Sequence, residues 1–381
     1  MQSRFDVFDA HVDTILRELD LGEDLGLAPG PVDTARHLDL VQGREGGLGA
    51  VVLAAWVAPH FVRGNEVLAK PDAQAGGANA RVHAILDTAH ALAARHPDQV
   101  AIVRNGAELS VARSAGLIAA ILGIEGGHAI ENSLTKLDEV HARGVRLMTL
   151  VWNNHLPWIR SCQTVPADLG FEVPAGLSDF GREVIARMNE LHMLADVSHS
   201  AVQTFDDVLE ASTAPVIASH SGCTAIRDHP RNLTDDQLRR LADAGGCVGI
   251  VFHGGFLDDE AAAEDARIYA SPEYRSIREG EGAPQGAALE YAQNAYHQRI
   301  AKPMSIEVVS DHIMHGIKVA GIEHVGLGSD YDGIPRTPEG LENAACYPNL
   351  AASLERRGLT SREIEGVLGG NLRRLFSDVC R

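Results

Sequence analysis

The sequence predicts an α/β protein that folds as a (β/α)₈ TIM barrel with inserted loops over its C-terminal face. Eight short apolar runs recur along the chain, and helical patterns lie between most of them. Such near-continuous apolar runs indicate strands buried on both faces, as a parallel sheet requires. No GxGxxG motif follows the first run, which argues against an open doubly wound sheet. The predicted strands cover residues 5–10, 50–57, 117–124, 145–151, 193–197, 215–219, 247–252 and 325–328.

Residues that begin or end helices mark the segments between the strands. Ser200 precedes one helical pattern and is a good N-cap residue type. Thr234 opens another, and the aspartates that follow it favour the positive end of the helix dipole. Gly321 follows the last pattern, where a helix is expected to stop. The predicted helices cover residues 80–95, 201–211, 234–245 and 305–320.

Two stretches look like insertions into the barrel. Residues 153–178 contain several prolines, and residues 257–303 are polar and acidic. Long loops that follow barrel strands usually cover the active site. We find no internal repeat and no low-complexity tract, so residues 1–381 are expected to form a single domain.

Composition limits the partners and the compartment. The formal net charge of −19 argues against nucleic acid and anionic membranes as partners. No apolar run reaches the ~18 residues of a membrane span, and residues 1–8 lack the basic and apolar regions of a signal peptide. The 5 cysteines include no CxxC pair, which argues against a disulfide framework. These features predict a cytoplasmic protein.

Ionisable residues gather where the predicted strands end. The C-terminal ends of barrel strands converge on one face, and barrel enzymes place their chemistry there. Along an extended backbone, residues at i and i+2 point the same way, so a His-x-Asp pair at the first strand can hold one ion. Imidazole with carboxylate is the usual ligand mix for zinc, and burying so many ionisable groups is costly unless a metal compensates them. The candidates are His11, Asp13, Glu125, His199, His220 and Asp330.

The segments around these residues resemble the renal (membrane) dipeptidase family, peptidases within the amidohydrolase superfamily. The matching segments occur in the family's order, and a family-like Gly-Gly-Asn follows near the C-terminus. Together they are highly specific, although any one of them alone would not be. They cover residues 9–13, 123–127, 196–200, 218–221, 229–233, 328–333 and 369–371.

The resemblance implies a zinc-dependent dipeptidase that hydrolyses the amide bond of dipeptides by a metal-bridged hydroxide. His11 and Asp13 would bind the first zinc ion, and His199 and His220 the second. Glu125 would bridge the pair. Members of the family are often dimers, which leaves a homodimer open for this chain.

The resemblance also implies roles in catalysis and substrate binding. Asp330 would act as general base and acid for the attacking water and the leaving amine. Arg231 would pair with the terminal carboxylate of the substrate, since its planar fork suits a bidentate contact. Without the resemblance, Arg231 would read as an ordinary surface arginine of the loop at residues 228–234.

One position departs from the family pattern. Well-studied members carry a histidine at the fourth strand end that contacts the substrate carbonyl oxygen, and Trp152 stands there in this chain. An indole donates a hydrogen bond but cannot become cationic. His155 or Asn153 would substitute if the loop folds back. His253, at the seventh strand end, is a further candidate for lining the substrate pocket.

Other residues near the strand ends are expected to support the site. His128 would hold its loop, Asp332 would lie behind the general base, and Asp196 would be a structural partner of the fifth strand's loop. For Trp152 and Trp158, loop packing and pocket lining are equally favoured from sequence.

Three other functions compete with the dipeptidase interpretation. The Trp152 departure favours an amidase or lactamase of the same superfamily that acts on a non-dipeptide amide. A catalytically dead metal-binding or scaffold protein is disfavoured, because both Glu125 and Asp330 are present. A deaminase is disfavoured because the first-strand motif is His-x-Asp and not His-x-His.

Overall fold

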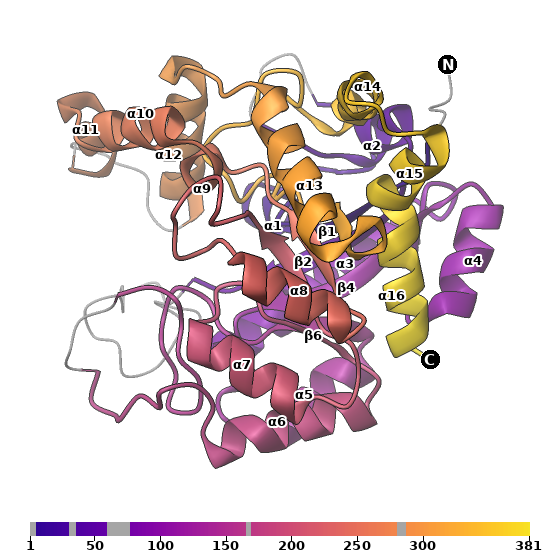
Figure 1. Ribbon diagram of the computed structural model, residues 1–381, viewed down its shortest axis with the longest axis vertical. Coiled ribbons are helices and arrows are strands. Elements are labelled where there is room, and N and C mark those ends of the chain that lie inside the picture. Colours follow the sequence, from indigo (N-terminus) through magenta and orange to yellow (C-terminus); the bar gives the residue numbers. More distant parts are fainter. Residues whose placement is uncertain (1–4, 30–35, 59–76, 165–168, 280–286) are drawn as a thin grey trace.

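The computed structural model describes residues 5–29, 36–58, 77–164, 169–279 and 287–381. Its parallel strands close into a ring, because β2 pairs with β4 on one side and with β1 on the other. Helices surround this ring (Figure 1). The predicted (β/α)₈ barrel is confirmed, and each predicted run overlaps one barrel strand. The barrel strands are β1 (Val7–Val12), β2 (Leu48–Trp56), β4 (Ile118–Glu125), β5 (Val145–Thr149), β6 (Leu194–Asp196), β7 (Ile217–Ser221), β8 (Cys247–Ile250) and β9 (Val325–Leu327).

A ninth strand lies outside the ring and was missed from sequence. β3 (Val100–Ile102) pairs with the first residues of β4, from Ile118 to Ala120, while the second half of β4 pairs with β5. With 3 residues, two of them only half-buried, β3 is too short to produce a recognisable apolar run.

The predicted helices are present, and two of the three predicted helix-end residues are confirmed. Thr234 and Gln237 form a reciprocal capping box at the start of one helix, and Gly321 ends another with a φ of 91°. The predicted cap at Ser200 is wrong. Ala201 is the N-cap there and makes no side-chain cap, while Ser200 belongs to the turn that follows β6. The four helices are α3 (Gly77–Arg95), α7 (Val202–Ala211), α8 (Asp235–Asp243) and α13 (Ile306–Ala320).

Further helices complete the outer layer. They are α1 (Ile15–Leu21), α2 (Leu40–Gly46), α4 (Gly106–Ser114), α5 (Leu134–Ala142), α6 (Asp179–Glu190), α14 (Tyr347–Arg356), α15 (Ser361–Glu365) and α16 (Asn371–Val379). Within the part of the chain that the structure describes, no helix has both the length and the apolar character needed to cross a lipid bilayer.

The two predicted insertions differ in structure. Apart from residues 165–168, which lie outside the described ranges, the stretch 153–178 is irregular and is held by isolated bridges such as Ile159 with Leu177. Apart from residues 280–286, which lie outside the described ranges, the second insertion folds as helices, most of which project from the barrel at the upper left of Figure 1. These helices are α9 (Gly254–Leu257), α10 (Asp259–Tyr269), α11 (Pro272–Glu279) and α12 (Ala287–Ile300).

Alternate residues of the barrel strands fill its interior. On β2, Ala50 and Val52 belong to the same buried cluster as Ala119 and Ile121 of β4. The same cluster includes Leu372 and neighbouring apolar residues of α16, so this helix packs against the N-terminal end of the barrel, where the strands begin. Because side chains alternate along a strand, this parity also places the last residues of β2 and β4 on the interior side at the opposite end.

One side-chain amide forms hydrogen bonds that stabilise the N-terminal end of the barrel, where the strands begin. Asn371 Nδ2 donates hydrogen bonds of 2.7 Å to both Ile322 O and Val325 O, at the start of β9. Asn371 follows a π-helical turn over residues 366–370. A Cβ at Gly369 would lie 2.4 Å from Asp6 O, so only glycine permits this close approach to the chain before β1.

Replacing this amide should cost stability. Asn371→Ala leaves two carbonyls without their donor, at about 1–3 kcal/mol each, so the free energy of unfolding should fall by about 2–4 kcal/mol. Urea denaturation measures this loss. Asn349 provides the control, since its Nδ2 donates a single bond of 2.9 Å to Gly340 O at the surface. Asn349→Ala should lose less than about 1 kcal/mol. An equal, small loss in both variants would contradict the role given to Asn371.

Candidate metal centre

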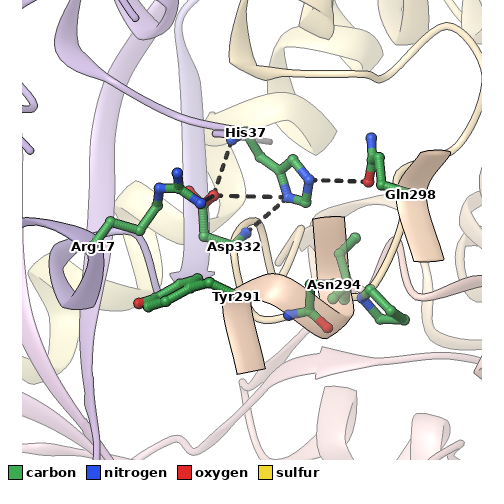
Figure 2. A pocket seen from close by; sticks show the side chains of 8 residues that line it. Arg17, His37, Tyr291, Asn294, Gln298 and Asp332 are labelled. Carbon is green, nitrogen blue, oxygen red and sulfur yellow. Dashed lines mark hydrogen bonds and ion pairs between the residues drawn. The ribbon is translucent and has the colours of Figure 1, made fainter. Parts of the chain in front are cut away.

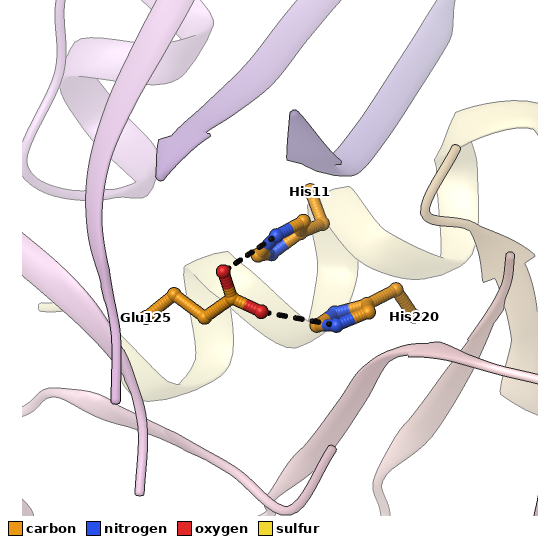
Figure 3. Close-up of side chains that lie close together, drawn as sticks. All are labelled: His11, Glu125 and His220. Atoms are coloured by element: carbon orange, nitrogen blue, oxygen red, sulfur yellow. Dashed lines mark ion pairs between the residues drawn. The ribbon is translucent and has the colours of Figure 1, made fainter. Parts of the chain in front are cut away.

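Three imidazoles surround one carboxylate at the C-terminal end of the barrel. Glu125 Oε1 lies 3.0 Å from His199 Nε2 and 3.4 Å from His220 Nε2. Glu125 Oε2 lies 3.7 Å from His11 Nε2, which is also 3.7 Å from Asp13 Oδ2. Figure 3 shows Glu125 between His11 and His220, with its two oxygens facing different rings. All five side chains are buried.

Hydrogen bonds to the outer ring nitrogens fix the tautomers of two of these histidines. His199 Nδ1 lies 2.8 Å from Asn153 Oδ1, an acceptor, so Nδ1 carries the proton. Ser219 Oγ donates its own proton to Asp196 at 2.6 Å and therefore accepts from His220 Nδ1 at 2.8 Å. Both Nε2 atoms, 3.0 Å apart, then present lone pairs to each other. When both rings are neutral and Glu125 is ionised, no proton lies between these atoms. Their lone pairs then repel one another, and a bound cation would remove this repulsion.

A second group adjoins the first and shares His11 with it. His11, Asp13 and Asp330 have potential ligand atoms within 4.8 Å of one another. Gly333 permits this crowding, since a Cβ there would lie 2.1 Å from Asp13 Oδ2 and 2.3 Å from Asp330 Oδ1. Asp330 has a φ of 62°, in the left-handed region, and its backbone N donates to His11 O at 2.9 Å. Such backbone conformations cluster at functional sites.

Burial makes this cluster unstable with all its carboxylates ionised and no cation. Burial raises the pKa of Glu125 and of Asp330 above their usual values, and the nearby charge of Asp13 raises both further against the opposing effect of His11. Burial disfavours a charged His11, but Glu125 and its neighbouring carboxylates outweigh that effect and raise the pKa of this imidazole. Neither ring nitrogen of His11 has a hydrogen-bond partner among the described residues. The donor set therefore fits divalent cations.

Arg231 is a buried cation at the edge of this site. Its side chain follows β7, is 2% exposed, and donates from Nη2 to His220 O at 3.1 Å. The guanidinium carbon lies 5.3 Å from the ring centre of Phe256. Its Nε and Nη1 have no hydrogen-bond partner in the described ranges. The interpretation of Arg231 as an ordinary surface arginine is therefore wrong, and its free donors suit an anionic group.

Two buried aspartates hold the strand ends around the ligands. Asp196 Oδ1 accepts hydrogen bonds of 2.9 Å from the backbone of Ser198 and Ser219, and Oδ2 accepts one of 2.5 Å from Thr149 Oγ1. It thereby ties β5, β6 and β7 together, as expected from sequence. Asp9 makes the equivalent connection between β1 and the end of β9, because its Oδ1 accepts from the backbone N of Ser329 at 2.9 Å.

Asp332 holds the loop that carries Asp330, also as expected. Its carboxylate accepts hydrogen bonds from Thr14 Oγ1 at 2.5 Å and from the backbone N of His37 at 3.0 Å. His37 Nδ1 accepts from the backbone N of Asp332 at 3.0 Å, so His37 Nε2 carries the proton that it donates to Gln298 Oε1 at 3.2 Å. Figure 2 shows the contacts of His37 with Asp332 and Gln298 beside a small cavity of about 10 Å³. These contacts connect α12 of the second insertion to the site.

Sequence did not identify His37, Ser219 or the hydrogen bond of Asn153 to a ligand histidine. His37 and Asn153 lie in irregular segments whose path no periodic pattern reveals. A signal was present for Ser219, because it directly precedes His220 and follows a buried strand.

The remaining candidates lie around the rim of the site. Trp152 packs edge-to-face on Trp56, with ring centres 5.2 Å apart, and its own ring centre lies 6.2 Å from that of His199. His155 Nδ1 accepts from the backbone N of Ser161 at 3.1 Å, a bond within its own loop. His253 caps α9 and stacks on Phe256 at 4.0 Å.

His128 and Trp158 both stabilise loops around the site. His128 Nε2 lies 2.8 Å from Val57 O, which holds the loop after β4 as expected. Trp158 is 1% exposed and packs edge-to-face on Phe180, so loop packing explains it. All 5 cysteines are free, in agreement with the expected absence of a disulfide framework.

Comparison with known proteins identifies the family. The membrane dipeptidase family model matches residues 1–381. A dipeptidase of Schizosaccharomyces pombe, itself uncharacterised, is 36% identical over 69% of this chain, a match that spans only 54% of that relative. Dipeptidase verJ of Clonostachys rogersoniana is 31% identical over 90% of this chain and 76% of its own.

Solved structures give the same result. A metallopeptidase from Rhodobacter sphaeroides, bound to a phosphinate mimic of the dipeptide L-Ala-D-Ala, is 26% identical with a TM-score of 0.77, covering 99% of this chain and 100% of its own. The dipeptidase AC of family M19 has the same identity and TM-score and covers 99% of both chains. The resemblance seen in the motifs is thus confirmed, and the chain belongs to the membrane dipeptidase family, peptidase family M19.

Proposed function

We propose that this chain is a zinc-dependent dipeptidase that hydrolyses the amide bond of dipeptides. The observation that carries the proposal is the convergence of Glu125 Oε1 with the Nε2 atoms of His199 and His220, whose other ring nitrogens already carry their protons. Family membership supports the reaction class. The dipeptide mimic bound by the Rhodobacter sphaeroides relative supports a dipeptide as the substrate.

The site has donors for two ions. His11 and Asp13 would hold one zinc ion, and His199 and His220 the other. Glu125 would bridge them, because its two oxygens face different imidazoles. When bound, the zinc ions supply the hydroxide nucleophile and polarise the scissile carbonyl.

Asp330 moves the proton. Its carboxylate belongs to the group that includes His11 and Asp13, within reach of a water molecule there. Asp330 takes the proton of the attacking water and delivers it to the nitrogen of the leaving amine.

Arg231 holds the substrate. In its buried setting, Nε or Nη1, which have no partner among the described residues, together with the remaining N–H of Nη2 would form the planar fork that binds the terminal carboxylate of the dipeptide. The contact orients the scissile amide over the ligand cluster, since Arg231 is itself fixed by its bond to His220 O.

A second candidate function is an amidase or lactamase that acts on a non-dipeptide amide. The observation that favours it is Trp152, which stands where family members carry a carbonyl-binding histidine. The two functions differ in whether the substrate needs a free carboxylate.

The first prediction concerns metal content. After reconstitution with zinc and extensive dialysis, elemental analysis should find two zinc ions per chain, one for each donor group. Chelation should lower the melting temperature, because binding energy is then lost from the folded state. His199→Asn should lose zinc, whereas the control His96→Asn should not, since His96 bonds to Asp24 away from the ligand cluster. A chain that holds no divalent metal after reconstitution would rule out the mechanism.

The second prediction concerns proton transfer. Asp330→Asn should retain both metals while kcat falls by roughly 10²–10⁴-fold, the usual contribution of a general base. Steady-state kinetics with parallel metal analysis measures both quantities. Asp311→Asn is the matched control, because Asp311 pairs with Arg357 at the surface. Near-normal turnover in Asp330→Asn would remove this residue from the role.

The third prediction concerns the carboxylate anchor. A charge-assisted bidentate contact contributes about 1.5–3 kcal/mol, so Arg231→Ala should lower kcat/KM by roughly 10–200-fold for free dipeptides. The loss should be much smaller for C-terminally amidated dipeptides, which never make the full contact. Arg231→Lys should recover activity only in part, because an ammonium lacks the planar fork.

Arg239→Ala is the control for the loss of a cation, since Arg239 lies exposed on α8 and pairs with Asp235 at 3.7 Å. It should leave both substrates unaffected. If Arg231→Ala changes the hydrolysis of free and amidated dipeptides by the same factor, Arg231 is not the anchor. The amidase or lactamase function would then be favoured over the dipeptidase.

A further inference from the structure

A pair of tryptophans stands beside the candidate metal centre. Trp56 ends β2 in direct register with Glu125 of β4, and neighbours in register point to the same face of a sheet. Trp152 follows β5 and packs edge-to-face on Trp56, at an interplanar angle of 62°. Both indoles therefore lie at the C-terminal end of the barrel, where the metal ligands lie.

The surroundings of this pair differ from those of a packed core residue. Trp158 is 1% exposed and packs against Phe180, whereas Trp56 and Trp152 both remain partly exposed. Trp56 Nε1 is buried and has no hydrogen-bond partner among the described residues; the same is true of Trp158 Nε1, so partial exposure is what sets the pair apart. A tryptophan that packing alone explains usually finds an acceptor for its N–H or fills a closed space.

The ring order places Trp56 across the barrel from the carboxylate anchor, and Trp152, which follows β5, packs against it. Three strands separate β2 from β7 in either direction around the ring, so these strands lie opposite each other. Trp56 ends β2, and Arg231 follows β7 and bonds to His220 O. A dipeptide with its carboxylate at Arg231 and its amide at Glu125 therefore extends its amino-terminal residue toward Trp56 and Trp152.

We propose that Trp56 and Trp152 determine substrate specificity by binding an aromatic or large aliphatic side chain on the amino-terminal residue of the dipeptide. This inference rests on the proposed dipeptidase function. Indole faces and edges bind apolar side chains through buried area and offset aromatic contacts. They also attract cations, but Arg231 and bound zinc make the neighbourhood positive, which disfavours a lysine or arginine side chain there.

The test compares kcat/KM of the zinc-loaded full chain for Phe-Ala, Leu-Ala, Gly-Ala, Lys-Ala and Ala-Phe, each with L- and D-residues at the second position. Phe-Ala and Leu-Ala should exceed Gly-Ala by roughly 10–200-fold, the range that one apolar contact site achieves. In Trp152→Ala, the ratio of Phe-Ala to Gly-Ala should fall close to unity. Trp56→Phe, which keeps a smaller ring, should lower the ratio only in part.

Trp158→Phe is the matched control for the loss of an indole. It removes part of a buried ring that packs on Phe180, so it should lower stability while it preserves the ratio of Phe-Ala to Gly-Ala. Thermal melting of every variant confirms that the ratios compare folded proteins. A ratio rather than a rate is measured, because partial unfolding lowers the rates on all substrates equally.

The outcomes separate this inference from the function on which it rests. If the zinc-loaded chain hydrolyses none of the peptides, the dipeptidase function fails, and the inference fails with it. If it hydrolyses them but Trp152→Ala and Trp56→Phe keep the wild-type ratio, the dipeptidase function stands and the inference is overturned. A preference for Lys-Ala or for Ala-Phe over Phe-Ala would overturn it as well.

Discussion

The meeting of Glu125 Oε1 with two imidazole lone pairs is the constraint on which the rest of the site depends. Asn153 and the Ser219–Asp196 pair remove the imidazole tautomers in which a ring proton would lie between these atoms. Lone pairs held 3.0–3.4 Å apart repel one another in a buried setting. The fold therefore holds an arrangement that is unfavourable by itself and becomes favourable with a cation, which is how metal binding and folding are coupled.

Contacts between the barrel strands hold these groups close together. Ligands come from separate strands, and buried aspartates fasten the strand ends to one another. Asp196 connects β5, β6 and β7, while Asp9 connects β1 to the end of β9. Each of these carboxylates accepts backbone N–H groups in places where no water can reach them. Buried carboxylates therefore have two roles in this protein. Some connect the strand ends below the site, and others belong to the donor set within it.

The parts of the structure that sequence predicted share one physical origin. A parallel barrel strand is buried on both faces, so it appears as an apolar run, and its end appears as the first polar residue, as at Glu125. The remaining features leave no regular pattern in the sequence. β3 is too short to show a run, and the capping position at Ala201 depends on how the chain turns after β6. Asn153 reaches His199 from an irregular loop, whose path is set by tertiary contacts alone.

The site is also asymmetric, and this bears on its departure from the family pattern. Trp152 cannot carry the positive charge that a histidine could place at the same strand end. The fixed cation of the described site is then Arg231, after β7, whereas Trp56 ends the opposite strand, β2, and Trp152 packs on it. A substrate with a negative end and an apolar end matches this arrangement in only one direction. In the proposed dipeptidase, orientation of the scissile amide would therefore follow from this difference in polarity between the two sides of the site, and polarisation of its carbonyl would be left to cations bound around Glu125.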